Sequence, residues 1–94
     1  MSEAPKFTVS QFVAVTNQVL ETGLGDVVVY GEVSSFKINQ GKWIFFDLKD
    51  QESVISCFMV ASSLRTPIEN GMKIAVQATP KIFNRSGRFT LTIK

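Results

Sequence analysis

The chain has 94 residues, of which 45% are apolar, so its length and composition suit one domain with a single core. It has no histidine and one cysteine, Cys57, which argues against a disulfide, a zinc site or a histidine-based active site. The net charge is only +2, but residues 73–94 contain no acid and five basic residues, namely Lys73, Lys81, Arg85, Arg88 and Lys94. This distribution suits a polyanionic partner, with a role in solubility alone as the alternative.

No targeting or membrane signal stands out at the start of the chain or within it. The first residues lack the basic start and apolar stretch of a signal peptide, and no apolar run approaches the roughly 20 residues of a membrane span. The single cysteine fits a reducing compartment. We therefore expect a cytoplasmic protein that makes no membrane contact, holds no metal or cofactor and carries no catalytic residue.

The first predicted element is a helix over residues 9–22, after a disordered N-terminus at residues 1–6. Thr8 and Gln11 have the spacing of a capping box, and Phe7 and Phe12 have that of a hydrophobic staple. Apolar side chains recur at helical spacing and predict one apolar face, made by Val9, Phe12, Val13, Thr16, Val19 and Leu20. We expect this face to pack against a sheet.

From Val27 onward the apolar period is two, which indicates strands. Five are predicted, at residues 27–38, 42–50, 53–60, 72–83 and 87–94. Gly31 inside the first strand suggests a bulge or a sharp bend, and Pro80 indicates that its part of the fourth strand is an edge or a bulge. Residues 61–68 break the pattern and are predicted as a loop or one short helical turn.

This order predicts an all-β domain with an N-terminal helix, namely a five-stranded OB-fold Greek-key barrel over residues 7–94. The main structural competitor is an SH3-like barrel. Its strands are typically shorter, and it has no comparable N-terminal helix.

The second and third strands each have one face that suits the core. Aliphatic content selects Ile44, Phe46, Leu48, Ile55, Cys57 and Met59 as the core set. This leaves Trp43, Phe45 and Phe58 on the outer surface, beside polar residues such as Asp47 and Ser56. An exposed aromatic group of this size usually marks a contact surface.

Bases of single-stranded nucleic acid stack on such rings, at roughly 1–3 kcal/mol each, while nearby cations follow the phosphates. The cations closest in the predicted fold lie in two loops, and two further aromatics lie at strand ends. The predicted nucleic-acid-binding set is therefore Trp43, Phe45, Phe58, Lys37, Lys42, Arg85, Arg88, Phe36 and Phe83. The alternative is that the N-terminal helix or a partner domain covers the rings and makes them ordinary core.

Several motifs, in order along the chain, are similar to those of a known family. They are Phe7-Thr8-Val9-Ser10, Gly31-Glu32-Val33-Ser34-Ser35-Phe36-Lys37, Phe46-Asp47-Leu48-Lys49-Asp50 and Glu69-Asn70-Gly71-Met72-Lys73. As an ordered set they resemble the N-terminal domain of the large subunit of bacterial exonuclease VII. The resemblance covers the chain from about Phe7 to Ile93.

The resemblance implies an OB-fold domain that binds single-stranded DNA. It also implies that this chain is a fragment, with the nuclease domain and the region that gathers small subunits lying beyond Lys94. The full enzyme of that family degrades single-stranded DNA to oligonucleotides. Two alternatives use the same surface, namely an RNA-binding OB domain and a protein-docking module that forms a homodimer through its aromatic face.

Overall fold

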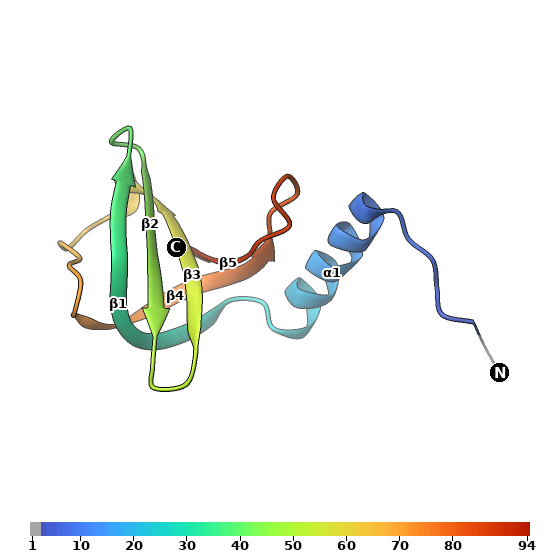
Figure 1. The fold of residues 1–94 in the computed structure, drawn as a ribbon, viewed down its shortest axis with the longest axis horizontal. Coiled ribbons are helices and arrows are strands. Elements are labelled where there is room, and N and C mark those ends of the chain that lie inside the picture. Colours follow the sequence, from blue (N-terminus) through green and yellow to red (C-terminus); the bar gives the residue numbers. More distant parts are fainter. Residues whose placement is uncertain (1–2) are drawn as a thin grey trace.

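A computed structural model describes residues 3–94 (Figure 1). Helix α1 (Val9–Gly23) precedes strands β1 (Val27–Asn39), β2 (Trp43–Lys49) and β3 (Val54–Val60). A short 3-10 turn, η1 (Ala61–Ser63), leads through a loop to β4 (Lys73–Ile82) and β5 (Phe89–Ile93). The elements differ from their predicted ranges by at most two residues at either end. Of the N-terminal stretch predicted as disordered, residues 1 and 2 lie outside the described residues.

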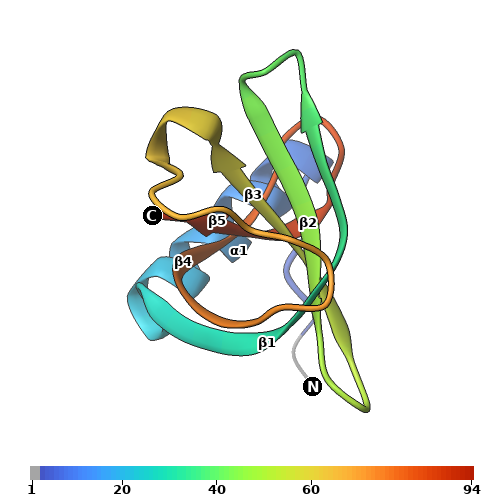
Figure 2. The same ribbon diagram turned by 90° about the vertical axis from the view of Figure 1, so that its left-hand side faces the viewer.

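The five strands form a closed barrel in the order β1-β2-β3-β5-β4. The β3–β5 pair is parallel and every other pair is antiparallel. This closed Greek-key barrel confirms the predicted OB fold. A 90° turn of the molecule shows the β1–β2 and β2–β3 hairpins extending in opposite directions from the barrel (Figure 2).

The barrel is filled by side chains from its inward-facing strand positions. The largest fully buried side chains are those of Phe46, Ile44, Val33 and Cys57. The inward faces predicted for β2 and β3 therefore supply much of the core, and Ile55 packs against it while half-buried. Their outward-facing neighbours remain available for contacts outside the barrel.

Strand β1 bends sharply and changes partner at Gly31. Its first half pairs with β4 and its second half with β2, and Glu32 is opposite both Lys73 and Lys49. A Cβ atom at Gly31 would lie 2.7 Å from the backbone oxygen of Lys49, so the two strands approach too closely for any side chain. The bulge of β1 lies further on, between Ser34 and Lys37, and the bend is at Gly31.

The proline of β4 lies where that strand has only one neighbour. Pairing of β4 with β1 ends at Ala78, while Pro80 is opposite Leu91 of β5. The predicted edge position is therefore correct, because Pro80 is on a stretch of β4 without a partner on the β1 side.

The start of α1 has the predicted local structure. The hydroxyl of Thr8 accepts a hydrogen bond from the Gln11 backbone N–H at 3.1 Å, and the Gln11 side chain accepts one from the Thr8 N–H at 2.9 Å. The rings of Phe7 and Phe12 meet edge to face, 6.1 Å apart between centroids. These contacts form the capping box and the hydrophobic staple that fix where the helix begins.

The helix projects from one end of the barrel and packs mainly on β4 (Figure 1). Val13 is its one buried residue, and the Asn17 side chain forms two hydrogen bonds with the backbone of Ile82. Phe12 and Val19, both part of the predicted apolar face, remain 54% and 63% exposed. The expectation that this whole face packs on the sheet is wrong, because the helix docks at one end of β4. No helix among residues 3–94 is long and apolar enough to cross a membrane.

Candidate nucleic-acid interface

Four aromatic rings form a continuous group on the outer surface of β2 and β3, which we call the aromatic cluster. Phe58 is at its centre, with ring centroids 5.2 Å from Phe45, 5.8 Å from Trp43 and 5.8 Å from Phe83. The strands explain the arrangement, because Phe45 and Phe58 are directly opposite in the β2–β3 ladder and Trp43 is two residues before Phe45 on the same face. Phe83 joins from the end of β4.

The aromatic cluster is accessible from outside. Trp43 is 41% exposed, and Phe45, Phe58 and Phe83 are half-buried, largely against one another. One alternative was that the N-terminal helix covers these rings. Helix α1 instead packs mainly on β4 and leaves the rings accessible. The cluster is therefore a surface feature of residues 3–94.

A groove of about 770 Å³ runs beside the cluster. It lies between the second half of β1, the outer face of β2 and β3, and the loop that joins β4 to β5. Five of the predicted residues line it, namely Phe36, Lys37, Phe45, Phe83 and Arg88. The groove gives a ligand lying on the rings a path that also passes charged side chains.

Phe36 is held at the groove by contacts on both of its sides. Its backbone N–H donates to the side-chain oxygen of Asn70 at 2.9 Å, and its ring stacks on that of Phe46 with centroids 6.3 Å apart. It sits in the bulge of β1, where Ser35 has a positive φ of 55°. Phe36 is thus half-buried against the core, and only part of its ring is available to a ligand.

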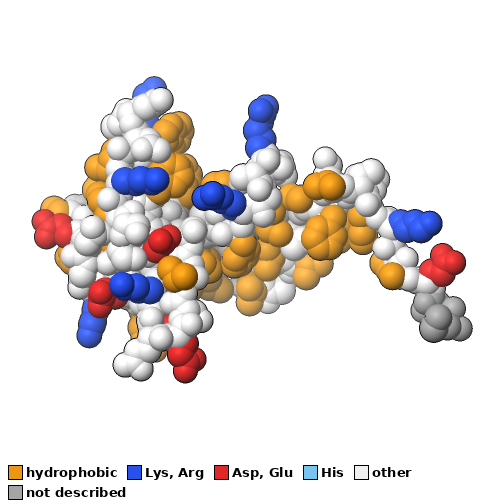
Figure 3. Space-filling model, in the orientation of Figure 1, with side chains coloured by type: hydrophobic (Ala, Val, Ile, Leu, Met, Phe, Trp, Pro, Cys, Tyr) orange, Lys and Arg blue, Asp and Glu red, His pale blue; other side chains and the backbone are white. Residues whose placement is uncertain are grey.

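The predicted cations lie at the two ends of this surface. Lys37 is opposite Phe45 in the β1–β2 ladder, and Lys42 follows a tight turn at Gln40 and Gly41, both with positive φ. Arg85 and Arg88 lie in the β4–β5 loop, which Phe83 closes through its hydrogen bond with Arg88. Figure 3 shows Lys and Arg side chains projecting from the β1–β2 hairpin and from this loop, with hydrophobic surface between them.

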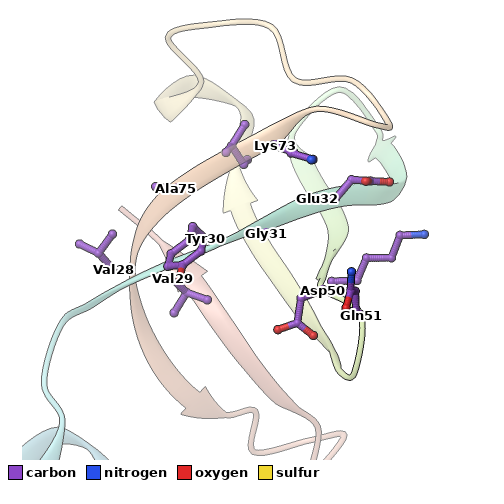
Figure 4. Close-up of a pocket in the computed structure, with 11 residues that line it drawn as sticks. Val28, Val29, Tyr30, Gly31, Glu32, Asp50, Gln51, Lys73 and Ala75 are labelled. Atoms are coloured by element: carbon purple, nitrogen blue, oxygen red, sulfur yellow. The ribbon is translucent and has the colours of Figure 1, made fainter.

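Two other basic residues of the C-terminal segment, Lys73 and Lys94, lie in other parts of the surface. Lys94 forms an ion pair with Asp26 at 3.2 Å. The pKa of Asp26 is lowered, first by the hydrogen bond from the Thr79 hydroxyl and then by Lys94. Lys73 lines a second hollow, of about 960 Å³, that shares no lining residue with the groove (Figure 4). The clustering of cations in residues 73–94 of the sequence thus overstates how many lie near the aromatic cluster.

Eight of the groove-lining residues were not predicted as part of the site, and two of these, Asp47 and Cys57, have side chains that can titrate. Asp47 is half-buried on the outer face of β2. Strand alternation in the sequence predicted that it lies on this face but did not indicate a function for it. Cys57 is buried, and burial, followed by the charge of Asp47, raises the pKa of its thiol to about 12. The thiol therefore stays protonated near neutral pH and is not an activated nucleophile.

The arrangement joins stacking surfaces, positive charge and a hollow between them. Among residues 3–94, no group of three or more His, Cys, Asp or Glu side chains could hold a metal ion. Rings with cations at both ends suit an extended, negatively charged ligand that carries flat aromatic groups.

Comparison with known proteins gives a consistent result. Residues 7–94 match the family described as "OB-fold nucleic acid binding domain". The chain is 38% identical over 80 residues to the exodeoxyribonuclease 7 large subunit of Ruminiclostridium cellulolyticum, covering 82% of this chain and 19% of that protein. It is 33% identical over 92 residues to the protein of the same name from Clostridium botulinum strain Loch Maree, covering 93% and 23% of the two chains.

A more distant relative of the same name, from Rickettsia typhi, is 23% identical over 96 residues and is covered over 21% of its length. The chain thus spans about a fifth of the length of the curated relatives it matches. The resemblance to the exonuclease VII large subunit that the sequence motifs indicated is confirmed.

Proposed function

Since the chain belongs to the family of OB-fold nucleic acid binding domains, we propose that its ligand is single-stranded DNA, bound across the aromatic cluster and the groove. The observation that carries this proposal is the aromatic cluster itself. Its rings are accessible and lie between two pairs of cations. Lys37 of β1 and Lys42 of the β1–β2 turn form one pair, and Arg85 and Arg88 of the β4–β5 loop form the other.

In this proposal each part of the surface has a separate task. Bases unstacked from their neighbours lie on Trp43, Phe45 and Phe58, and the backbone phosphates pass the two pairs of cations. Every base has a flat face, so stacking tolerates any sequence. The closed barrel keeps β2 and β3 rigid beneath the rings, so little ordering of the protein is needed when the strand binds.

The relatives are named as large subunits of an exodeoxyribonuclease, and the chain covers about a fifth of their length. We therefore propose that this domain holds single-stranded DNA for a nuclease domain that lies elsewhere in such a subunit. In the same proposal, contact with the small subunit of that enzyme is made outside these residues. The role of the domain is then to capture and guide the strand, with the cleavage chemistry supplied by the other domain.

The test is fluorescence anisotropy with a labelled oligothymidine at low and at moderate salt. Binding should weaken as salt rises, because phosphate contacts release counterions. Trp43→Ala should weaken binding by about 1–3 kcal/mol, the usual contribution of one stacked base. Because Trp43 is 41% exposed and outside the core, the variant should remain folded.

Tyr30→Ala is the matched control, because Tyr30 is an 81% exposed aromatic that lines the second hollow instead of the groove. It should bind like the parent protein. Absence of binding at low salt, or binding that salt does not change, would refute the proposal. A competing RNA oligomer that displaces the DNA completely would favour the RNA-binding alternative, and a concentration-dependent dimer unaffected by DNA would favour the docking module.

A further inference from the structure

The groove contains a carboxylate that the proposed phosphate path does not use. Asp47 lies on the outer face of β2, two residues after Phe45, and lines the groove together with Phe36 and Arg88. A negative charge at this place repels phosphate groups. The strand must therefore lie with its phosphates away from Asp47, which leaves the edges of its bases to face this side chain.

The side chain of Asp47 is half-buried but has no hydrogen-bonding or ionic partner within the part of the chain that the structure describes. Its neighbours across the ladder are Ser34 in β1 and Ser56 in β3, both of them small. Among residues 3–94, the Asp47 carboxylate enters no side-chain hydrogen bond and no ion pair, although Arg88 lines the same groove. Its oxygens remain available as acceptors for a donor that enters the groove.

The spacing along β2 brings this acceptor within reach of a stacked base. Side chains two residues apart on a strand are about 6.6 Å apart and point to the same side. A base lying on the ring of Phe45 extends sideways beyond that ring, and one of its edges then faces Asp47. In a single strand the edge used for base pairing is free to take part in such a contact.

We propose that Asp47 accepts a hydrogen bond from the exocyclic amino group of the base stacked on Phe45. This inference rests on the proposed function and adds a base preference to it. Carboxylates accept from the N4 amino group of cytosine. Uracil and thymine carry a carbonyl oxygen at the same position. Their one donor on this edge, the N3 imino group, lies between two carbonyl oxygens that a carboxylate repels, so the groove discriminates against these bases.

The sharpest comparison uses oligodeoxycytidine and oligodeoxyuridine of equal length, because the two bases differ only in the group at position 4 and in the proton that uracil carries on N3. Near neutral pH and at low salt, the parent protein should bind the cytidine oligomer at least about tenfold more tightly, the effect of one hydrogen bond to a charged acceptor. Asp47→Asn supplies both a donor and an acceptor, so the ratio should fall to about one. Binding of the uridine oligomer should strengthen, because a repulsive charge is lost.

Glu52→Gln is the control, because it also removes one negative charge but lies in the β2–β3 turn and does not line the groove. It should leave the cytidine-to-uridine ratio unchanged. Equal binding of the two oligomers by the parent protein, or a ratio that survives Asp47→Asn, would overturn this inference while leaving the proposed function intact. Failure of both oligomers to bind at low salt would overturn the proposed function itself.

Discussion

Gly31 is the residue at which β1 leaves β4 and begins to pair with β2. Its importance comes from a backbone contact, since a Cβ atom there would meet the oxygen of Lys49 at 2.7 Å and the Leu48 side chain at 3.2 Å. A backbone oxygen in a paired strand cannot rotate away as the end of a long side chain can. The strand pattern predicted a bend or a bulge here, but the close approach depends on the other strand and is visible only in the folded barrel.

We expect Gly31→Ala to lower the free energy of unfolding by about 1–3 kcal/mol, because the added methyl group forces β1 and β2 apart. Urea denaturation followed by Trp43 fluorescence measures this change. Gly23→Ala is the control, since a Cβ there would meet nothing within 4 Å and alanine is favoured in a helix. A Gly31→Ala protein as stable as the Gly23→Ala protein would contradict the steric account.

At the scale of elements, α1 shows what periodicity can and cannot predict. The pattern located the start of the helix, since the residues that form the capping box are close in sequence. It could not determine how much of the apolar face the barrel covers. That depends on where β4 ends. The decisive contact is the pair of hydrogen bonds between the Asn17 side chain and the Ile82 backbone, two residues that are 65 positions apart in sequence.

Asn17→Ala should loosen α1 from the barrel. The backbone N–H and carbonyl of Ile82, now paired with Asn17 at 2.7 and 2.9 Å, would lose their partners in a half-buried position, at a cost of about 1–3 kcal/mol. Hydrogen exchange followed by mass spectrometry should show faster exchange in α1, while β2 and β3 keep their protection. Gln18→Ala is the control, because the neighbouring Gln18 is exposed. Hydrogen exchange in α1 of this variant should equal that of the parent protein. Equal exchange in the Asn17→Ala and Gln18→Ala variants would exclude the proposed role of Asn17.

On the scale of the whole molecule, barrel closure is the step that assembles the candidate site. Alternation along single strands was sufficient to predict that Trp43, Phe45 and Phe58 face outward, because the period of two holds within each strand. It could not bring Phe83 to Phe58. That contact depends on the parallel pairing of β3 with β5 and on the return of β4, both of which join distant parts of the chain.

Barrel closure also determines which cations lie close together in space. Two variants with the same net charge but different positions of the removed cations can therefore test whether the local charge of the groove or the overall charge attracts the DNA. Two double variants each reduce the net charge from +2 to 0. One, Lys37→Ala with Arg88→Ala, removes two cations of the groove, and the other, Lys49→Ala with Lys73→Ala, removes two that line the second hollow. If overall charge attracts the DNA, both should weaken binding equally.

We expect a marked difference, because charges that touch phosphates release counterions whereas distant ones act only through a screened field. The logarithm of the binding constant falls linearly with the logarithm of the salt concentration. For the groove variant this negative slope should be shallower by about 1.4, roughly 0.7 for each lost phosphate contact of a single strand. The hollow variant should keep the parent slope. Equal slopes in the two variants would mean that the strand does not follow the groove, even if it still stacks on the aromatic cluster.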